Sequence, residues 1–215
     1  MKADIAVPRH TVIDLPLIGG TSCLDFSNTA AAWDHPSFHG YLDSYGDLLI
    51  WAGRAGLIDE TTERLLRQAA EAAPAAAEAA LRKGLALRAT IQAIFAAVAG
   101  RRPAPQPEVM ALDQMLVHAL PHRGIAVGAE RFHWAWRDSA SLDRPLWPIV
   151  LDAARVLMDA DPSRIKQCGG AECGWLFVDT SKNGSRRWCQ MEACGSRSKA
   201  HSYYHRKTGK RQSAP

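Results

Sequence analysis

The sequence predicts an α+β protein: a mostly helical N-terminal domain with a small antiparallel β element, followed by a small C-terminal module built on four cysteines. Three observations carry this prediction. Helical periodicity recurs between residues 43 and 158, one short stretch alternates apolar with polar residues, and four of the five cysteines fall within residues 164–210. At 215 residues with 47% hydrophobic content, the chain is long enough for a medium-sized core and one small module.

The N-terminal stretch is predicted to be largely extended. Residues 11–17 and 22–27 are short apolar-rich runs on either side of Gly19 and Gly20, which predicts two strands, or a strand and a loop. Cys23 lies in the second run, where we expect a buried free thiol that packs as a small apolar side chain.

Two polar residues within and just after this run have two interpretations. Asp25 and Asn28 either cap or pin a loop, or they line a polar ligand pocket beside Trp33. The residues alone leave both interpretations open.

Five helices are predicted, each bounded by residues that begin or end a helix. Asp43 or Ser44 can cap the first of them. The first helix runs from there to about residue 55, and the others span residues 59–73, 75–99, 108–119 and 146–158. In the same order, the residues that end them are Gly56, Pro74, Gly100, Pro121 and Asp161-Pro162.

Residues 124–137 predict the antiparallel β element. Phe132, Trp134 and Trp136 alternate with small or polar residues after a turn at Gly128, so they form one aromatic face. This face either packs on the helices or forms the wall of a ligand pocket.

The break after the last of these helices predicts a domain boundary. We expect a domain over residues 1–162 and a second module over 163–215. Because the connecting loop is short, the module should dock against the first domain.

Four cysteines predict one structural zinc ion. Cys168 and Cys173 form a C-x4-C pair, and fifteen residues later Cys189 and Cys194 form another. Two such pairs can fold back on each other to give the four tetrahedral thiolates of a zinc finger, one ion per chain. Between them, residues 175–180 alternate as a strand does.

Further signals complete the expected finger. Asn183-Gly184 predicts a hairpin turn, and residues 196–206 can form a helix that abuts the metal, so the module should be a hairpin plus helix of treble-clef-like form. Two disulfides, or His201 or His205 in place of one cysteine, are the alternatives; a reducing compartment favours metal.

Both parts of the chain resemble a known family. The C-terminal segment resembles the CGNR zinc finger, which that family carries behind an ABATE domain of stress-induced transcription regulators. The resemblance rests on Cys168, Cys173, residues 175–179 and 186–189, Met191, residues 194–197 and Lys199, and for the ABATE part on residues 19–29 and 47–57.

One position departs from the family pattern. Ser196 stands where the family has the Asn of its CGNR motif. Serine can replace asparagine as a helix cap, whereas a contact from that Asn to a base or phosphate would be affected.

The C-terminal segment is strongly basic. Residues 164–215 hold eleven Lys and Arg against three Asp and Glu, whereas residues 1–163 hold fifteen against nineteen. A basic module with interleaved aromatics on an acidic body favours a polyanion partner, although the cations could simply face solvent or pair with the acidic body. The expected nucleic-acid contacts are Arg186, Arg187, Arg197, Lys199, Arg206 and Lys207.

The function expected from these features is DNA-binding transcription regulation, with an N-terminal domain that senses a small-molecule effector or mediates homodimerisation. The alternative is a zinc-stapled module that binds protein or RNA. We expect no enzyme, because nucleophile-elbow, P-loop, dinucleotide-binding and H-E-x-x-H motifs are absent from the sequence.

The expected location is the cytoplasm. The sequence has no run of eighteen apolar residues, and we see no signal peptide, in which a positively charged stretch precedes an apolar one. We therefore expect no membrane association.

Overall fold

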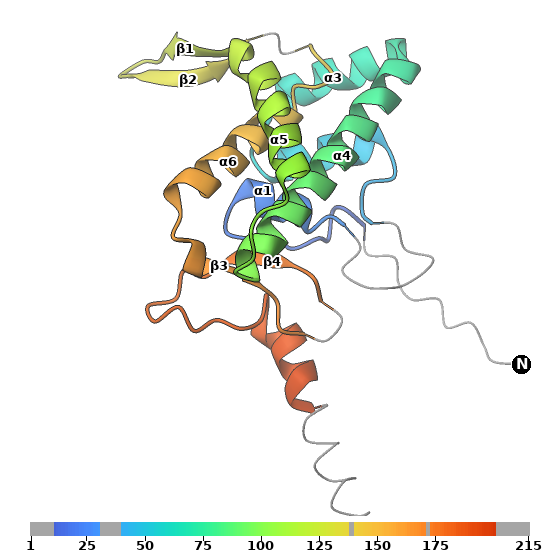
Figure 1. Ribbon diagram of the computed structural model, residues 1–215. Helices are drawn as coiled ribbons and strands as arrows, with labels where there is room; N and C mark the ends of the chain where they lie inside the picture. The colour runs from blue at the N-terminus through green and yellow to red at the C-terminus, as the bar shows by residue number, and fades with distance from the viewer. Residues whose placement is uncertain (1–10, 31–39, 138–139, 171–172, 201–215) are drawn as a thin grey trace, which may run out of the picture.

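The computed structural model describes residues 11–30, 40–137, 140–170 and 173–200. It is mostly helical and holds two small antiparallel sheets, which confirms the predicted α+β class (Figure 1). The helices are α1 (Ser22–Ser27), α2 (Tyr45–Arg54), α3 (Glu60–Ala72), α4 (Pro74–Ala99), α5 (Gln106–Ala119) and α6 (Leu146–Asp159), and the strands are β1 (Arg123–Val127), β2 (Phe132–Trp136), β3 (Ile165–Gln167) and β4 (Leu176–Val178).

The core lies around α4, the longest helix, which contacts all of the other helices. Trp51, Phe26 and Phe95 are among its largest fully buried side chains. Gly84 lets α4 approach its neighbours closely, since an added Cβ would lie 3.2 Å from a methyl of Leu146. Residue 84 is therefore the close-packing point on which the α4 interface depends.

The observed ends of α2 to α6 lie within about two residues of the predicted ends, which were read from local capping and helix-breaking residues. The Ser44 side chain accepts from the Asp47 N–H, and Asp47 accepts in return from the Ser44 N–H, which forms a capping box. Asp59 caps α3 through the Thr62 N–H, and α4 begins at Pro74. These ends follow from short-range hydrogen bonding.

The predicted strand over residues 22–27 is wrong, because this run forms the short helix α1. Five of its six residues are buried, including the polar Asp25 and Ser27, so the run has no exposed polar face, and so short a pattern cannot separate a strand from a buried helix. Residues 11–17 form a turn and irregular chain without a strand. Cys23 is fully buried, as expected.

The β1–β2 hairpin is confirmed, with Ile125 opposite Trp134 and Val127 opposite Phe132. Among the described residues, its aromatic face packs on the helices at its base, where the Trp136 ring lies 5.8 Å from that of Trp147. The expected packing of Trp134 is wrong, because this side chain is largely exposed. The hairpin extends beyond the helices that would cover it (Figure 1).

We call residues 164–200 the finger and residues 11–160 the body. In the finger, β4 pairs with β3, which precedes the first cysteine. The expected return strand after Asn183-Gly184 is wrong: Gly184 does form a turn, with φ +59°, but residues 179–190 hold no strand. A π-helical turn over Met191–Gly195 leads into α-helix over 196–200, and the rest of the predicted 196–206 helix lies outside the described residues.

The finger docks on the body through backbone hydrogen bonds as well as shared core. The side-chain amide of Asn28, the C-cap of α1, donates to the Leu176 carbonyl (2.9 Å) and accepts from the Leu176 N–H (2.8 Å). The Val178 N–H donates to the Gly19 carbonyl at 2.8 Å. Ile165 and Leu176 are buried in the body's own core. This confirms the expected docking.

Within the described residues, no helix is long and apolar enough to cross a bilayer.

We predict that Asn28→Ala loosens the finger from the body. The substitution leaves the Leu176 N–H and carbonyl buried without partners, which costs about 2–4 kcal/mol. Amide hydrogen exchange should accelerate at Leu176 and Val178 more than in α5. Asn183→Ala, in the exposed turn, is the control and should change stability by less than about 0.5 kcal/mol. Unchanged protection of Leu176 in Asn28→Ala would contradict the docking described here.

Candidate metal centre

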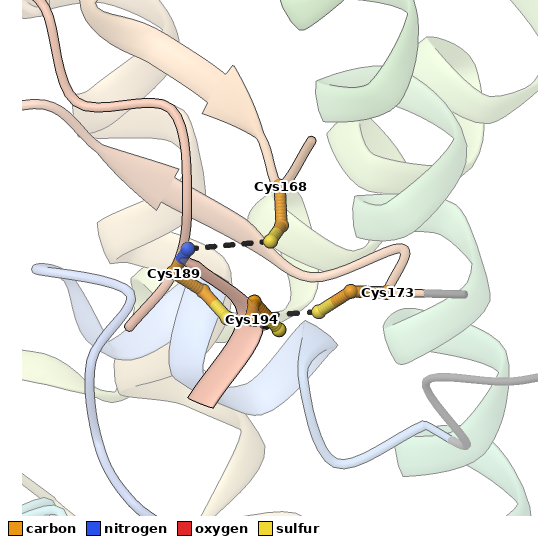
Figure 2. A group of neighbouring side chains, drawn as sticks. All are labelled: Cys168, Cys173, Cys189 and Cys194. Atoms are coloured by element: carbon orange, nitrogen blue, oxygen red, sulfur yellow. Dashed lines mark hydrogen bonds between the residues drawn. The ribbon is translucent and has the colours of Figure 1, made fainter. Parts of the chain in front are cut away.

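Four cysteines from separate segments of the finger meet at one point (Figure 2). Cys168 follows β3 and Cys173 precedes β4, so the β3–β4 hairpin presents the first pair. Cys189 lies in the loop after the Gly184 turn, and Cys194 lies in the π-helical turn. The sulfurs thus come from one hairpin, one loop and the start of one helix. The hairpin-plus-helix form is as predicted, but its hairpin is β3–β4 and does not turn at Asn183-Gly184.

The distances between these sulfurs fit a tetrahedral metal site. The four Sγ atoms lie within 4.8 Å of one another, and Cys189 Sγ is 3.6 Å from both Cys173 Sγ and Cys194 Sγ. A tetrahedron with Zn–S bonds of about 2.3 Å requires sulfurs about 3.8 Å apart, whereas a disulfide requires about 2.05 Å. All five cysteines are free. The donor set therefore fits one structural Zn²⁺ with four thiolates, and the cofactor prediction is confirmed.

Hydrogen bonds favour thiolate at this centre. The Cys189 N–H donates to Cys168 Sγ at 3.3 Å, and the Arg197 guanidinium donates to Cys194 Sγ at 3.5 Å. Hydrogen bonds from the Cys173 and Cys189 thiols and from the Cys189 N–H lower the pKa of Cys168, and the same thiol contacts raise the pKa of Cys173 and Cys189. Zinc binds deprotonated thiols, so it is the backbone N–H and guanidinium contacts that lower the cost of forming the complex.

The chain also leaves little space around the sulfurs. A Cβ at residue 170 would lie 3.2 Å from the Cys173 Cβ and 3.5 Å from Cys194 Sγ, so Gly170 permits the close turn between the first two ligands. All four cysteines are buried. A buried site in which four protein ligands occupy all coordination positions is typical of a structural metal ion.

Arg186 is engaged inside the protein. Its guanidinium lies 4.2 Å from the centre of the Phe177 ring and donates to the carbonyls of Trp188, Cys189 and, at 3.4 Å, Ile18 of the body. These contacts fix the loop that presents Cys189. The nucleic-acid contact of Arg186 stays a prediction, and its guanidinium donors are directed at backbone carbonyls.

Two further cations have the same inward role. Arg164 donates to the Ser181 carbonyl, and Lys166 donates to the Gly184 carbonyl at 3.0 Å. Buried Asp179 accepts from the Arg186 and Ser181 N–H groups at 2.9 Å; burial opposes its ionisation, but these hydrogen bonds outweigh burial and lower its pKa. The loop over 179–186 is therefore held by ionic and backbone contacts.

The other predicted contact residues differ in placement. Arg187 and Lys199 are exposed, and the Arg187 guanidinium lies 5.2 Å from the Trp188 ring. Arg197 is at the Cys194 sulfur, and the Ser196 hydroxyl donates to the Met191 carbonyl, so Ser196 does not act as the expected N-cap. Arg206, Lys207, His201 and His205 lie outside the described residues.

The residues of the predicted ligand pocket have contacts within the protein. Asn28 holds β4, as described, and the Asp25 carboxylate accepts from the Gly19 N–H at 2.7 Å. These contacts match the loop-pinning interpretation. Trp33 lies outside the described residues, so the pocket stays a prediction.

Among the described residues, no cation hydrogen-bonds to the buried Asp25 carboxylate. Burial raises its pKa to about 6, and the charge of Asp152 adds to this, while hydrogen bonds from the Gly19 and Ile18 backbone oppose it. Gly19 donates its N–H to Asp25 and accepts from the Val178 N–H of the finger, so Asp25 directly contacts a residue that joins the body to the finger.

Sequence reasoning singled out Asn28 but missed that Asn28 and Gly19 join the finger to the body. Gly19 has no room for a side chain, since an added Cβ would lie 2.8 Å from the Asp25 nitrogen. The Gly19-Gly20 pair was the one sign in the sequence that the backbone is closely packed here. Nothing in the local sequence separates the inward cations Arg164, Lys166 and Arg186 from the exposed ones, because their partners are backbone carbonyls.

Comparison with family models finds two matches. The model described as "CGNR zinc finger" matches residues 164–207. The model for ABATE, described as "Putative stress-induced transcription regulator", matches residues 20–160, which is more than half of the chain. No curated protein gives a significant match.

We predict one zinc ion per chain, lost when a ligand is removed. Cys189→Ser should reduce the zinc content well below one per chain by elemental analysis, and Cys23→Ala, the control for a buried cysteine outside the site, should retain it. Chelation should unfold the finger because metal binding supplies about 10–16 kcal/mol in such modules. A finger that keeps its amide protection after complete metal removal would contradict this.

We also predict a pH dependence from Asp25. Its folded pKa lies above the ordinary 3.8, so its contribution is present at low pH and is lost as pH rises through about 6. The unfolding free energy of the wild type minus that of Asp25→Asn should fall by roughly 1 kcal/mol between about pH 5.5 and about pH 7.5. Urea unfolding of both zinc-loaded proteins measures this. A difference that stays constant across the range would disprove the burial effect.

Proposed function

This chain belongs to the ABATE family and carries a C-terminal CGNR zinc finger, and from that premise we propose that it is a transcription regulator that binds DNA through its finger. The description of the family supports the regulatory role. The charge of the finger supports DNA as the partner.

The observation that carries the proposal is the charge of the finger segment. Residues 164–215 have eleven Lys and Arg against three acidic residues, on a body with more acidic than basic residues. Duplex DNA attracts such a segment because cations that contact its phosphates release condensed counterions. An acidic body would keep the rest of the protein away from the DNA, so the finger would meet it first.

The described cations divide into two groups. Arg164, Lys166 and Arg186 donate to backbone carbonyls and shape the finger. Lys182, Arg187 and Lys199 are exposed. We assign phosphate contacts to this exposed group, together with Arg206 and Lys207, and a positioning role at the metal to Arg197.

Zinc has a structural role in this proposal. Four thiolates fill a tetrahedral site and leave no position for a water or a substrate. We therefore propose that the protein acts by binding and has no catalytic activity, and that it works in the cytoplasm, where thiols stay reduced and can hold zinc.

The body supplies regulation. Because the finger shares its core and hydrogen bonds with α1 and the Gly19 loop, a change in the body would reach the metal-bearing segment. Such a change would come from an effector or from self-association.

We predict salt-dependent binding to duplex DNA. With the five proposed phosphate contacts, the slope of log affinity against log salt should be about −4.5. The double variant Arg187→Ala and Lys199→Ala should reduce the size of the slope by about 2. Fluorescence anisotropy with a labelled duplex and the full-length zinc-loaded protein measures both.

Arg64→Ala on α3 is the matched control, since it removes an exposed cation from the body. Its slope should equal that of the wild type. Binding that does not depend on salt, or tighter binding to RNA or to a protein than to duplex DNA, would overturn the proposal in favour of an interaction module.

A further inference from the structure

The outer half of the β1–β2 hairpin carries an exposed apolar face, which we call the hairpin face: Ile125, Val127, Phe132 and Trp134 are 69%, 80%, 72% and 64% exposed. The register pairs Ile125 with Trp134 and Val127 with Phe132, so these side chains share one side of the sheet. We propose that this face binds the same face of a second copy of the chain and forms a homodimer. This deepens the regulatory role proposed for the body.

Among the described residues, the hairpin contacts the body at its base. There Trp136 packs against Trp147 of α6, and the His122 ring stacks on the same Trp147 with ring centres 3.9 Å apart. A two-stranded hairpin alone is marginally stable in water and needs one face packed. Within the part of the chain that the structure describes, the hairpin face is left largely uncovered.

Arg123 gives the hairpin face a defined shape. Its guanidinium carbon lies 5.4 Å from the Trp134 ring centre and 4.6 Å from that of Trp136. A cation over both rings restricts the exposed indole in the free protein. A restricted aromatic side chain loses less conformational entropy when a partner covers it, which favours binding.

The area of the face matches what a weak dimer needs. An aromatic side chain offers about 150–250 Å² when fully exposed, so these four side chains present roughly 500 Å². Two copies would bury at most about 1,000 Å² in total from these side chains, which is the lower limit for a specific interface. The expected dimer is therefore transient, with a dissociation constant in the micromolar range.

The distribution of side-chain sizes favours a second copy as the partner. β1 contributes the two aliphatic side chains and β2 the two aromatic ones. A twofold axis parallel to the strands sets the aliphatic strand of each copy on the aromatic strand of the other, so large groups meet small ones twice. The hairpin and the finger lie at opposite ends of the molecule (Figure 1), which leaves both fingers free.

Sedimentation equilibrium of the full-length, zinc-loaded protein tests the proposal. The wild type should pass from monomer to dimer between low micromolar and several hundred micromolar concentration. The double variant Val127→Ser and Trp134→Ser should raise the dissociation constant at least about a hundredfold. Met158→Ser, which changes an exposed side chain near the far end of α6, should leave it unchanged.

The arrangement of the two hairpins is tested by mixing two variants. Val127→Lys alone and Phe132→Glu alone should stay monomeric, because each buries two uncompensated charges in the symmetric dimer. An equimolar mixture should form a heterodimer, in which residue 127 of one copy faces residue 132 of the other as a Lys–Glu pair. A mixture that stays monomeric would overturn the arrangement.

A wild type that remains monomeric throughout, or a dimer indifferent to the Val127→Ser and Trp134→Ser changes, would overturn the proposal. The experiment contains no nucleic acid, so its failure leaves the DNA-binding proposal standing. Conversely, absence of DNA binding would leave this result intact.

Discussion

Coordination of one metal ion by four buried thiolates is the constraint on which the finger depends. The segment has few apolar side chains of its own: Phe177 is the only large apolar side chain that packs fully buried among the four cysteines in the described residues. A core of that size cannot offset the conformational entropy of ordering the chain. The sulfurs replace it, because they join the hairpin, the loop and the helix at one point.

The finger is stabilised by the body as well as by its metal. Leu176 and Ile165 complete the body's core, and Asn28 satisfies both backbone groups of Leu176. The Arg186 guanidinium contacts the Ile18 carbonyl of the body and the Cys189 carbonyl of the finger. Metal occupancy and docking are therefore linked, because one guanidinium contacts both the body and the carbonyl of a metal ligand.

Features set by short-range interactions could be predicted from the sequence. Capping by Ser44 and Asp59, and the Pro74 and Gly100 boundaries of α4, mark the helices, and cysteine spacing predicts the four sulfurs that the fold brings together. Features set by distant partners could not be predicted. Asn28 and Leu176 are 148 residues apart, and α1 is helical because its buried surroundings, not its pattern, select that form.

X-ray absorption at the zinc edge of the full-length protein tests the central claim most directly. Coordination by Cys168, Cys173, Cys189 and Cys194 predicts four sulfur neighbours at about 2.3 Å and no nitrogen or oxygen in the first shell. A nitrogen or oxygen neighbour at about 2.0–2.1 Å would show that a histidine or a water replaces a thiolate, and would contradict the closed structural site.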